Sequence, residues 1–260
     1  QSTTSNIYTV ECSSINAGIS IFDNFLSKKL SFSHCSAIIF SEEIAKQGIG
    51  KYVKTLSNNP EIRPTCNIII SNSKSLETLE CISNSHEDFS AKLYEFIINS
   101  VDYTGYSINP QIGEFFYNLN SDIATPIATY AVLSDDTLQN SGIAAFKEDK
   151  FITDLCVLDA LSYSLVTNQL NSCTISIDNP FLPNEKMDIS VSQRKAPKIE
   201  ISIVNNHPFI KIKSPLECSI KSASDSFEYE STKNLKILEE SINSYLEEIT
   251  LNFLYKISHD

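Results

Sequence analysis

Histidine, cysteine and acidic side chains are the groups in this 260-residue chain that could do chemistry. His34 and Cys35 are adjacent, but neighbouring residues of a strand point to opposite faces and cannot share a proton. The pair therefore indicates structure rather than an activated nucleophile. His86, Glu87 and Asp88 could offer nitrogen and oxygen ligands to a metal, yet acidic residues at the polar start of a helix are favoured by its dipole. We expect a helix cap there rather than a metal site.

The remaining candidates lack the partners that their chemistry needs. His207 and His259 have no second metal ligand at a useful spacing. Gly48 and Gly50 follow a predicted helix without the later glycine and lysine of a phosphate-binding loop. The acidic pair at 135–136 lies in a solvated stretch, where nothing favours general acid catalysis. The sequence predicts a non-enzyme with no catalytic, cofactor-binding or metal-ligating residue and no cofactor, although a site built from aromatic side chains would leave no motif.

Residues 142–155, GIAAFKEDKFITDL, form the most informative stretch, in which two short apolar strands flank a charged turn. The turn reads Lys147, Glu148, Asp149 and Lys150. Four consecutive charged residues cannot be buried, so a hairpin with a solvated turn is expected. Charged tips on rigid hairpins also suit reversible polar interfaces. Two interpretations stay open: a plain solvated turn, which we favour, and a partner contact made by these four residues.

Seven cysteines occur without a C-x-x-C pair or a cysteine–histidine metal spacing. They are Cys12, Cys35, Cys66, Cys81, Cys156, Cys173 and Cys218. Several lie inside apolar runs, where cysteine behaves as a small buried hydrophobe. An odd number without framework spacing favours seven free structural thiols. Either the compartment is reducing or the organism does not rely on disulfides.

The composition is that of an ordinary globular protein, with 42% hydrophobic and 20% charged residues, enough for one large or two modest domains. The net charge of −12 is spread evenly over both halves, and only Arg63 and Arg194 supply guanidinium groups. This balance argues against nucleic-acid partners and against direct adhesion to anionic lipid. The sequence contains no run of about 18 apolar residues, which is the length a segment needs to span a bilayer. The first residues lack the charged start and apolar centre of a signal peptide.

The first half of the chain alternates strand-like and helix-like segments. Alternating or short apolar runs predict strands at 6–12, 35–40, 66–71 and 127–133. Helical patterns occupy 19–30, 42–47, 50–60, 75–83, 88–101 and the residues after Asn109-Pro110. Ser41 is expected to cap the second of these helices and Gly48 to end it. Strands separated by helices favour a mixed or parallel sheet with crossover connections.

The second half changes character after a polar linker at 134–140, where we place the domain boundary. A short helix is predicted at 158–166, followed by alternating segments at 173–177, 187–193, 198–204, 209–213 and 216–222. These segments predict an antiparallel meander with one solvated face, in which 198–204 and 209–213 pair across the turn at 205–208.

A long amphipathic helix is predicted from Asn234 to Tyr255. Its apolar stripe consists of Leu235, Leu238, Ile242, Tyr245, Ile249 and Phe253. Such a stripe suits a coiled-coil seam, a partner-binding helix or packing on the chain's own sheet. We favour the last, because an antiparallel sheet needs one apolar face buried. The expected fold is α+β and multidomain: a mixed α/β domain at 1–135, with a break near 102–108 that could divide it, and an antiparallel sheet packed against a long helix at 138–260.

The sequence of the hairpin closely resembles the first segment of the C-terminal domain of the Ger(x)C (GerAC-type) spore germination proteins. Residues 21–71 are similar to the N-terminal domain of that family, with Ser33-His34 before a buried strand, the helix SEEIAKQGIGKYV, and NNPEIR before a second buried strand. Ser33 stands where the family usually has glycine, while Pro60 to Arg63 match. The resemblance covers most of the chain in the right order, and its strength lies in that collinearity rather than in one motif.

The resemblance implies a non-catalytic lipoprotein C subunit of a spore nutrient germinant receptor, which associates with the multipass A and B membrane subunits and supports germinant sensing and signalling. It also implies a place outside the cytoplasm, at the outer surface of the spore inner membrane, through a lipid anchor. Family members are normally longer, and Cys12 lacks a lipobox context, so we expect this chain to be a truncated soluble portion. The anchor is inferred from the family alone.

Two other functions stay open at this stage. In one, aromatic side chains of the middle segment line a pocket that binds a nutrient; they are Tyr94, Phe96, Tyr103, Tyr106, Phe115, Phe116 and Tyr117. In the other, the chain is a structural protein of the envelope that only shares this architecture.

Overall fold

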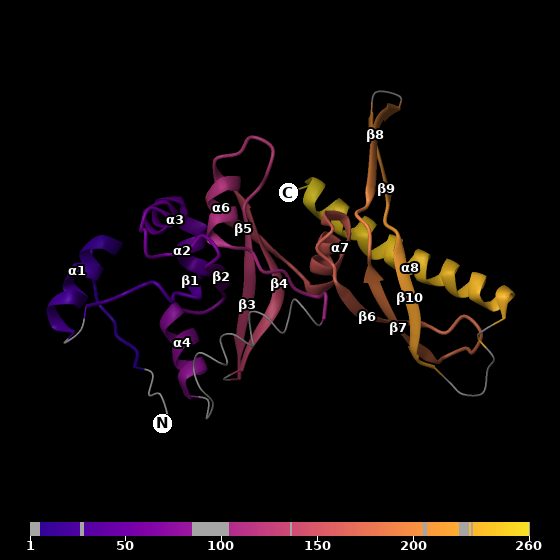
Figure 1. Ribbon diagram of the computed structural model, residues 1–260, viewed down its shortest axis with the longest axis horizontal. Coiled ribbons are helices and arrows are strands. Elements are labelled where there is room, and N and C mark those ends of the chain that lie inside the picture. The colour runs from indigo at the N-terminus through magenta and orange to yellow at the C-terminus, as the bar shows by residue number, and fades with distance from the viewer. Residues whose placement is uncertain are drawn as a thin grey trace. The chain divides into compact units, whose positions relative to one another are not determined.

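The computed structural model describes residues 6–26, 29–84, 104–135, 137–204, 207–223, 229 and 231–259 (Figure 1). The chain divides into two compact units. Unit 1 comprises Gln1–Asn99 and Ile108–Leu155, and unit 2 comprises Ser100–Ser107 and Cys156–Asp260. Each unit combines helices with a sheet of its own, so the predicted α+β class is confirmed.

Unit 1 is built on a five-stranded mixed sheet in the order β1-β2-β3-β4-β5. Its strands are β1 (Ala37–Ser41), β2 (Asn67–Ser71), β3 (Ile127–Ser134), β4 (Thr137–Lys147) and β5 (Lys150–Leu155). β1, β2 and β3 run parallel, whereas β4 and β5 are antiparallel additions. The crossover topology predicted from alternating strands and helices is therefore confirmed for this sheet.

Helices pack on both faces of this sheet. The unit contains α1 (Ile15–Phe25), α2 (Glu42–Gln47), α3 (Gly50–Ser57), α4 (Ser75–Asn84) and α6 (Ile112–Leu119). Residues of α2, α3 and α6 share one apolar core with the sheet, while Ile82 of α4 packs with Ile69 and Ala131 on another cluster. The Ser41 hydroxyl accepts a hydrogen bond from the Ile44 amide and caps α2, as expected.

Some local expectations were wrong. Residues 6–12 form no strand, although their alternation suits one. Within 134–140 the chain turns directly from β3 into β4, so the expected linker is strand and turn rather than spacer. The helix expected from Asn109-Pro110 begins at Ile112, because the amide of Ile68 bonds to the Pro110 carbonyl and keeps this stretch beside β2. The helix expected at 88–101 lies outside the described residues.

The compact units differ from the division expected at 134–140. The hairpin of β4 and β5 is the outer part of the first sheet, since β4 pairs with β3 along eight residue pairs from Ile127 to Ser134. Ser100–Ser107 groups with unit 2, and the expected subdivision near 102–108 stays a prediction. The pairing of β4 with β3 places the hairpin in unit 1, and local sequence patterns do not predict this pairing.

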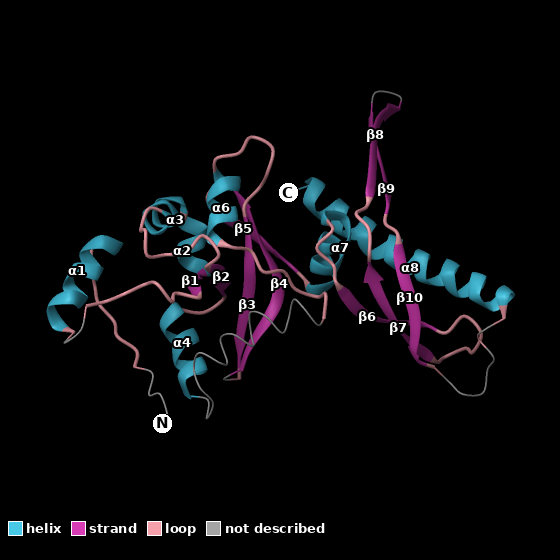
Figure 2. Cartoon of the chain, viewed as in Figure 1, coloured by secondary structure: helices cyan, strands magenta, loops and turns pink. Residues whose placement is uncertain are grey.

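Unit 2 contains a three-stranded antiparallel sheet in the order β10-β7-β6 and a separate two-stranded ribbon. The sheet strands are β6 (Ser172–Asp178), β7 (Lys186–Gln193) and β10 (Leu216–Ser222). The ribbon consists of β8 (Lys198–Val204) and β9 (His207–Lys213), which pair as predicted. The single meander expected from the sequence was wrong, because β10 pairs with β7 and leaves the ribbon outside the sheet. Figure 2 shows the ribbon continuing beyond β7 and β10.

The long helix α8 (Thr232–His259) covers this sheet together with α7 (Val157–Thr167). Leu238, Ile242, Leu246 and Ile249 of α8 are buried in one core with strand residues such as Ile189. Packing on the chain's own sheet is therefore confirmed for this stripe. Leu246 was missed as a core position, and Leu235 is 44% exposed.

Candidate partner-contact surfaces

The charged turn between β4 and β5 is held against the junction of α2 and α3. The Asp149 carbonyl accepts a hydrogen bond from the Ile49 amide (2.9 Å), and its carboxylate accepts one from the Gly50 amide (3.1 Å). Ile49 itself is fully buried. One of the four predicted contact residues thus satisfies the first free amides of α3, as a helix cap would.

The two glycines of this junction make room for Asp149. Gly48 has a φ of +113°, and a Cβ there would lie 2.7 Å from an Asp149 carboxylate oxygen. A Cβ on Gly50 would lie 2.9 Å from the Asp149 Cβ. The sequence predicted Gly48 as the end of a helix and excluded a phosphate loop, but it did not predict that both glycines make room for Asp149. The signal available was two glycines that bracket one apolar residue right after a helix.

The other three residues of the turn face solvent. Lys147, Glu148 and Lys150 are exposed, and Glu148 adopts a left-handed conformation with a φ of 54°. Asp149 is therefore used inside unit 1, so the turn is not wholly solvated, whereas the neighbouring charges remain accessible and a partner contact stays a prediction. A partner contact here would involve Glu148 and the lysines rather than Asp149.

The ribbon of β8 and β9 presents an exposed apolar face. Cross-strand pairing places Ile199 beside Ile212 and Ile201 beside Ile210, and Ile203 follows on the same side of β8. Ile201 and Ile203 are 72% and 77% exposed. A two-stranded ribbon is marginally stable by itself, and exposed aliphatic patches of this kind mark contact surfaces. Sequence reasoning expected these isoleucines to belong to the covered face of a larger sheet.

The opposite face of the ribbon is basic near its base. Lys198 pairs with Lys213 and Glu200 with Lys211, so three lysines oppose one glutamate in a chain with a net charge of −12. Farther along, this face carries Ser202 and Phe209, the latter 54% exposed. The ribbon therefore combines an aliphatic side with a locally positive one.

The described aromatic residues among those proposed to line a nutrient pocket belong to different units. Phe115 belongs to the core of unit 1, while Tyr106 belongs to unit 2, where its hydroxyl donates to the Thr174 carbonyl (2.8 Å). Burial raises the pKa of Tyr106 to about 12. Phe116 and Tyr117 line a groove of about 710 Å³ in unit 1 with Ile62, Pro64 and Ile112. Tyr94, Phe96 and Tyr103 lie outside the described residues.

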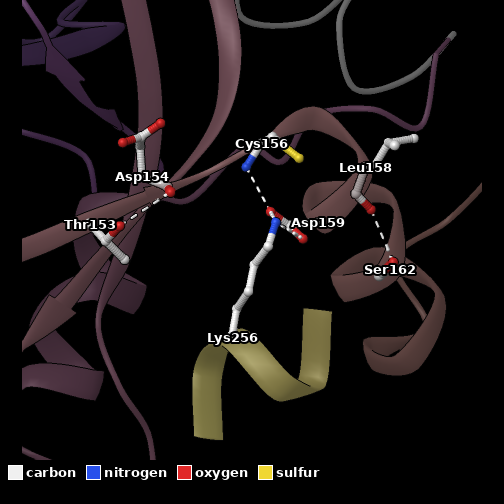
Figure 3. Close-up of polar contacts among 7 residues, drawn as sticks. All are labelled: Thr153, Asp154, Cys156, Leu158, Asp159, Ser162 and Lys256. Carbon is white, nitrogen blue, oxygen red and sulfur yellow. Dashed lines mark hydrogen bonds and ion pairs between the residues drawn. The ribbon is translucent and has the colours of Figure 1, made fainter. Parts of the chain in front are cut away.

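An ion pair between a half-exposed lysine and a buried carboxylate joins the two helices of unit 2 (Figure 3). Lys256 of α8 donates to both carboxylate oxygens of Asp159, at 3.0 and 2.7 Å, and the Asp159 side chain is 4% exposed. The same carboxylate accepts a hydrogen bond from the Cys156 amide at the start of α7 (2.9 Å). Every neighbour of Asp159 named here stabilises helix packing, so we read this carboxylate as structural.

The described residues contain no candidate metal site. Among the residues that the structure describes, no group of three or more histidine, cysteine or acidic side chains could hold a metal ion. His34 is exposed, and the acidic stretch at 86–88 lies outside the described residues, as do the side chains of His207 and His259. All seven cysteines are free thiols in the structure.

Two family models together match almost the whole chain. The model of the spore germination protein N-terminal domain matches residues 1–133, and that of the spore germination B3/GerAC-like C-terminal domain matches residues 141–260. The chain belongs to the GerAC-type family of spore germination proteins. This is a family of non-enzymatic proteins, and the resemblance deduced from the hairpin and from residues 21–71 is confirmed.

Two individual proteins extend the comparison. The spore germination protein GerQC of Bacillus cereus is 21% identical over 222 residues, which cover 85% of this chain and 61% of that protein. The crystal structure of the GerBC protein matches with a TM-score of 0.63 and 15% identity, over 87% of this chain and 64% of that one. The fold is therefore that of GerBC, although the chain spans less than two thirds of either relative. No described helix is both long and apolar enough to cross a membrane.

Proposed function

We propose that this chain is the soluble body of a germinant receptor C subunit, which acts without catalysis by binding the membrane-embedded A and B subunits of the receptor. Family membership and the similarity to GerQC and GerBC support this proposal. A lipid anchor would hold the protein outside the cytoplasm at the spore inner membrane. The function is then to supply protein surfaces through which nutrient sensing by the receptor is coupled to germination.

The observation that carries the proposal is the exposed aliphatic face of the ribbon, formed by Ile199, Ile201, Ile203, Ile210 and Ile212. The partner surface that covers this face is an apolar surface of a receptor subunit. Acidic residues surround that surface, because the lysines at 198, 211 and 213, on the ribbon's other face and base, would lie beside them. Burying such a face also supplies the packing that an isolated two-stranded ribbon lacks. An exposed hydrophobic surface is thereby turned into a subunit interface.

The test uses the full-length protein in spores of the organism that encodes it. Ile201→Thr with Ile203→Thr keeps β-branched residues in β8 but removes the aliphatic face. We expect co-purification with the A and B subunits to fall about tenfold or more, with little change in melting temperature. The matched control is Glu200→Thr with Ser202→Thr, which alters the opposite face of the same strand and should retain at least half of the wild-type co-purification.

The outcomes separate the two parts of the proposal. If the wild-type protein does not co-purify with the A and B subunits at all, the receptor function itself fails. If the isoleucine variant co-purifies like wild type, the ribbon is not the interface. Light scattering and vesicle flotation of the purified protein identify the other occupants: isoleucine-dependent dimerisation would assign the face to a second copy, and isoleucine-dependent flotation would assign it to lipid.

A further inference from the structure

Two of the seven cysteines lie side by side at the start of adjacent parallel strands. Cys35 Sγ and Cys66 Sγ are 3.5 Å apart, close enough for a thiol hydrogen bond. Cys35 precedes β1 by two residues and Cys66 precedes β2 by one, and the Asn67 amide bonds to the Ser36 carbonyl between them. The pair therefore sits where the ladder of β1 and β2 begins.

The backbone on each side of the pair is fixed by hydrogen bonds. The Cys35 amide donates to the Phe32 carbonyl, and the Cys66 amide donates to the Arg63 carbonyl, both at 2.9 Å. The Cys66 carbonyl in turn accepts from the Ile112 amide (2.8 Å). A disulfide has an S–S bond of about 2.0 Å, so forming it requires the two sulfur atoms to approach while the strands stay paired.

The two thiols differ in access and in acidity. Cys35 is half-buried and can meet a small reagent, whereas Cys66 is 2% exposed in the core of unit 1. A hydrogen bond from Cys66 lowers the pKa of Cys35 to about 7, and that same hydrogen bond together with burial raises the pKa of Cys66. An accessible thiol with thiolate character next to a shielded one is the arrangement of an attacking and a resolving cysteine.

We propose that Cys35 and Cys66 form a reversible dithiol–disulfide site that reacts with small disulfides. The Cys35 thiolate attacks one sulfur of a disulfide RSSR, forming a mixed disulfide and releasing the first thiol RSH. Cys66 then loses its proton and attacks the Cys35 sulfur, which releases the second RSH and leaves the Cys35–Cys66 bond. One RSSR is reduced to two RSH, and two protein thiols are oxidised to one disulfide.

The oxidised site would link the edge strand β1 to β2 at the start of their ladder. The bond closes a loop of the residues between 35 and 66, which restricts the unfolded chain. We expect the melting temperature to rise by about 5–10 °C on oxidation and to return on reduction. This modification is independent of the receptor proposal, because it concerns the stability of unit 1 rather than the ribbon.

A second cysteine pair in the same chain provides a matched control. Cys173 of β6 and Cys218 of β10 both lie opposite Val191 of β7, one on each side. They are two strand spacings apart, about 10 Å, whereas bridged cysteines have Cα atoms within about 7 Å. These two thiols should form no bond with each other under the conditions that oxidise Cys35 and Cys66.

The experiment treats the folded protein with oxidised glutathione, then alkylates the remaining thiols in denaturant and maps peptides by mass spectrometry. We expect one peptide linking Cys35 to Cys66 and a raised melting temperature, while glutathione on the exposed Cys12, Cys156 and Cys218 does not count toward the result. Cys35→Ser should keep all six of its thiols free of intramolecular bonds, and Cys218→Ser should still form the Cys35–Cys66 link. Cys35 is only half-buried, so we expect Cys35→Ser to fold, and its melting temperature before oxidation checks this.

Several results would overturn the proposal. Seven alkylated thiols after treatment would mean that the site does not react with disulfides. Glutathione retained on Cys35 without a Cys35–Cys66 link would mean that Cys66 does not resolve the mixed disulfide. An intramolecular disulfide in the Cys35→Ser protein would assign the oxidation to other cysteines.

Discussion

The chain contains two β-hairpins that differ in sequence and in surroundings. β4–β5 ends in four charged residues, yet its turn is bonded to the α2–α3 junction through Asp149 and its strands complete a five-stranded sheet. β8–β9 is rich in isoleucine, yet its strands stand outside the sheet of unit 2 with Ile203 77% exposed. Local polarity therefore does not decide which hairpin is buried.

Pairing partners explain the difference. β4 lies between β3 and β5 and is covered by helices, so Phe146 packs between Phe115 and Phe151. β8 has one neighbour, β9, and no described helix is buried against its isoleucines. The first hairpin is part of a hydrophobic core, whereas the second exposes aliphatic side chains of the type found in a core. We therefore predict that the first hairpin contributes to stability and the second to recognition.

The largest expected effect contrasts one phenylalanine from each hairpin. Phe146 is 1% exposed and its ring centroid is 4.9 Å from that of Phe115, whereas Phe209 is 54% exposed. Phe146→Ala should lower the free energy of unfolding by about 3–5 kcal/mol. Phe209→Ala should lower it by less than about 1 kcal/mol. Urea denaturation of both variants measures this, and similar losses would show that the ribbon is packed in solution.

An intermediate effect is expected at the docked turn. Asp149→Ala removes the acceptor of the Gly50 amide and should cost about 1–3 kcal/mol. Gly48→Ala places a Cβ near the same carboxylate at a φ of +113° and should also destabilise. Because the clash needs the Asp149 side chain, the double variant should lose less than the sum of the two single losses. Full additivity in thermal denaturation would mean that the two residues do not interact.

This contact limits how the turn can be tested. Replacing both Glu148 and Asp149 by lysine would remove the hydrogen bond to the Gly50 amide inside unit 1, so we expect the melting temperature to fall. A change at the exposed Glu148 leaves that bond in place.

Much of the fold follows from local sequence. The Ser41 cap, the Gly48 stop and the stripe of α8 were readable because capping chemistry and helical periodicity act within a few residues. Long-range pairing was not readable: nothing in 216–222 reveals that this strand would join β7 rather than β9. The docking of Asp149 on Gly50 was equally hidden, because its partners are 99 residues apart. Family resemblance succeeded where local patterns failed, because it uses the order of many weak signals.

Substitution of Glu148 is expected to have the smallest effect on stability, and it tests the function of the turn. We propose that its exposed carboxylate, between Lys147 and Lys150, adds a polar contact to the receptor interface. Glu148→Lys should change the free energy of unfolding by less than about 0.5 kcal/mol, as is usual for exposed positions. It should nevertheless slow nutrient-triggered germination of spores, whereas the charge-neutral Glu148→Gln should slow it less. Wild-type germination of the lysine variant would leave this turn as a solvated loop and assign recognition to the ribbon alone.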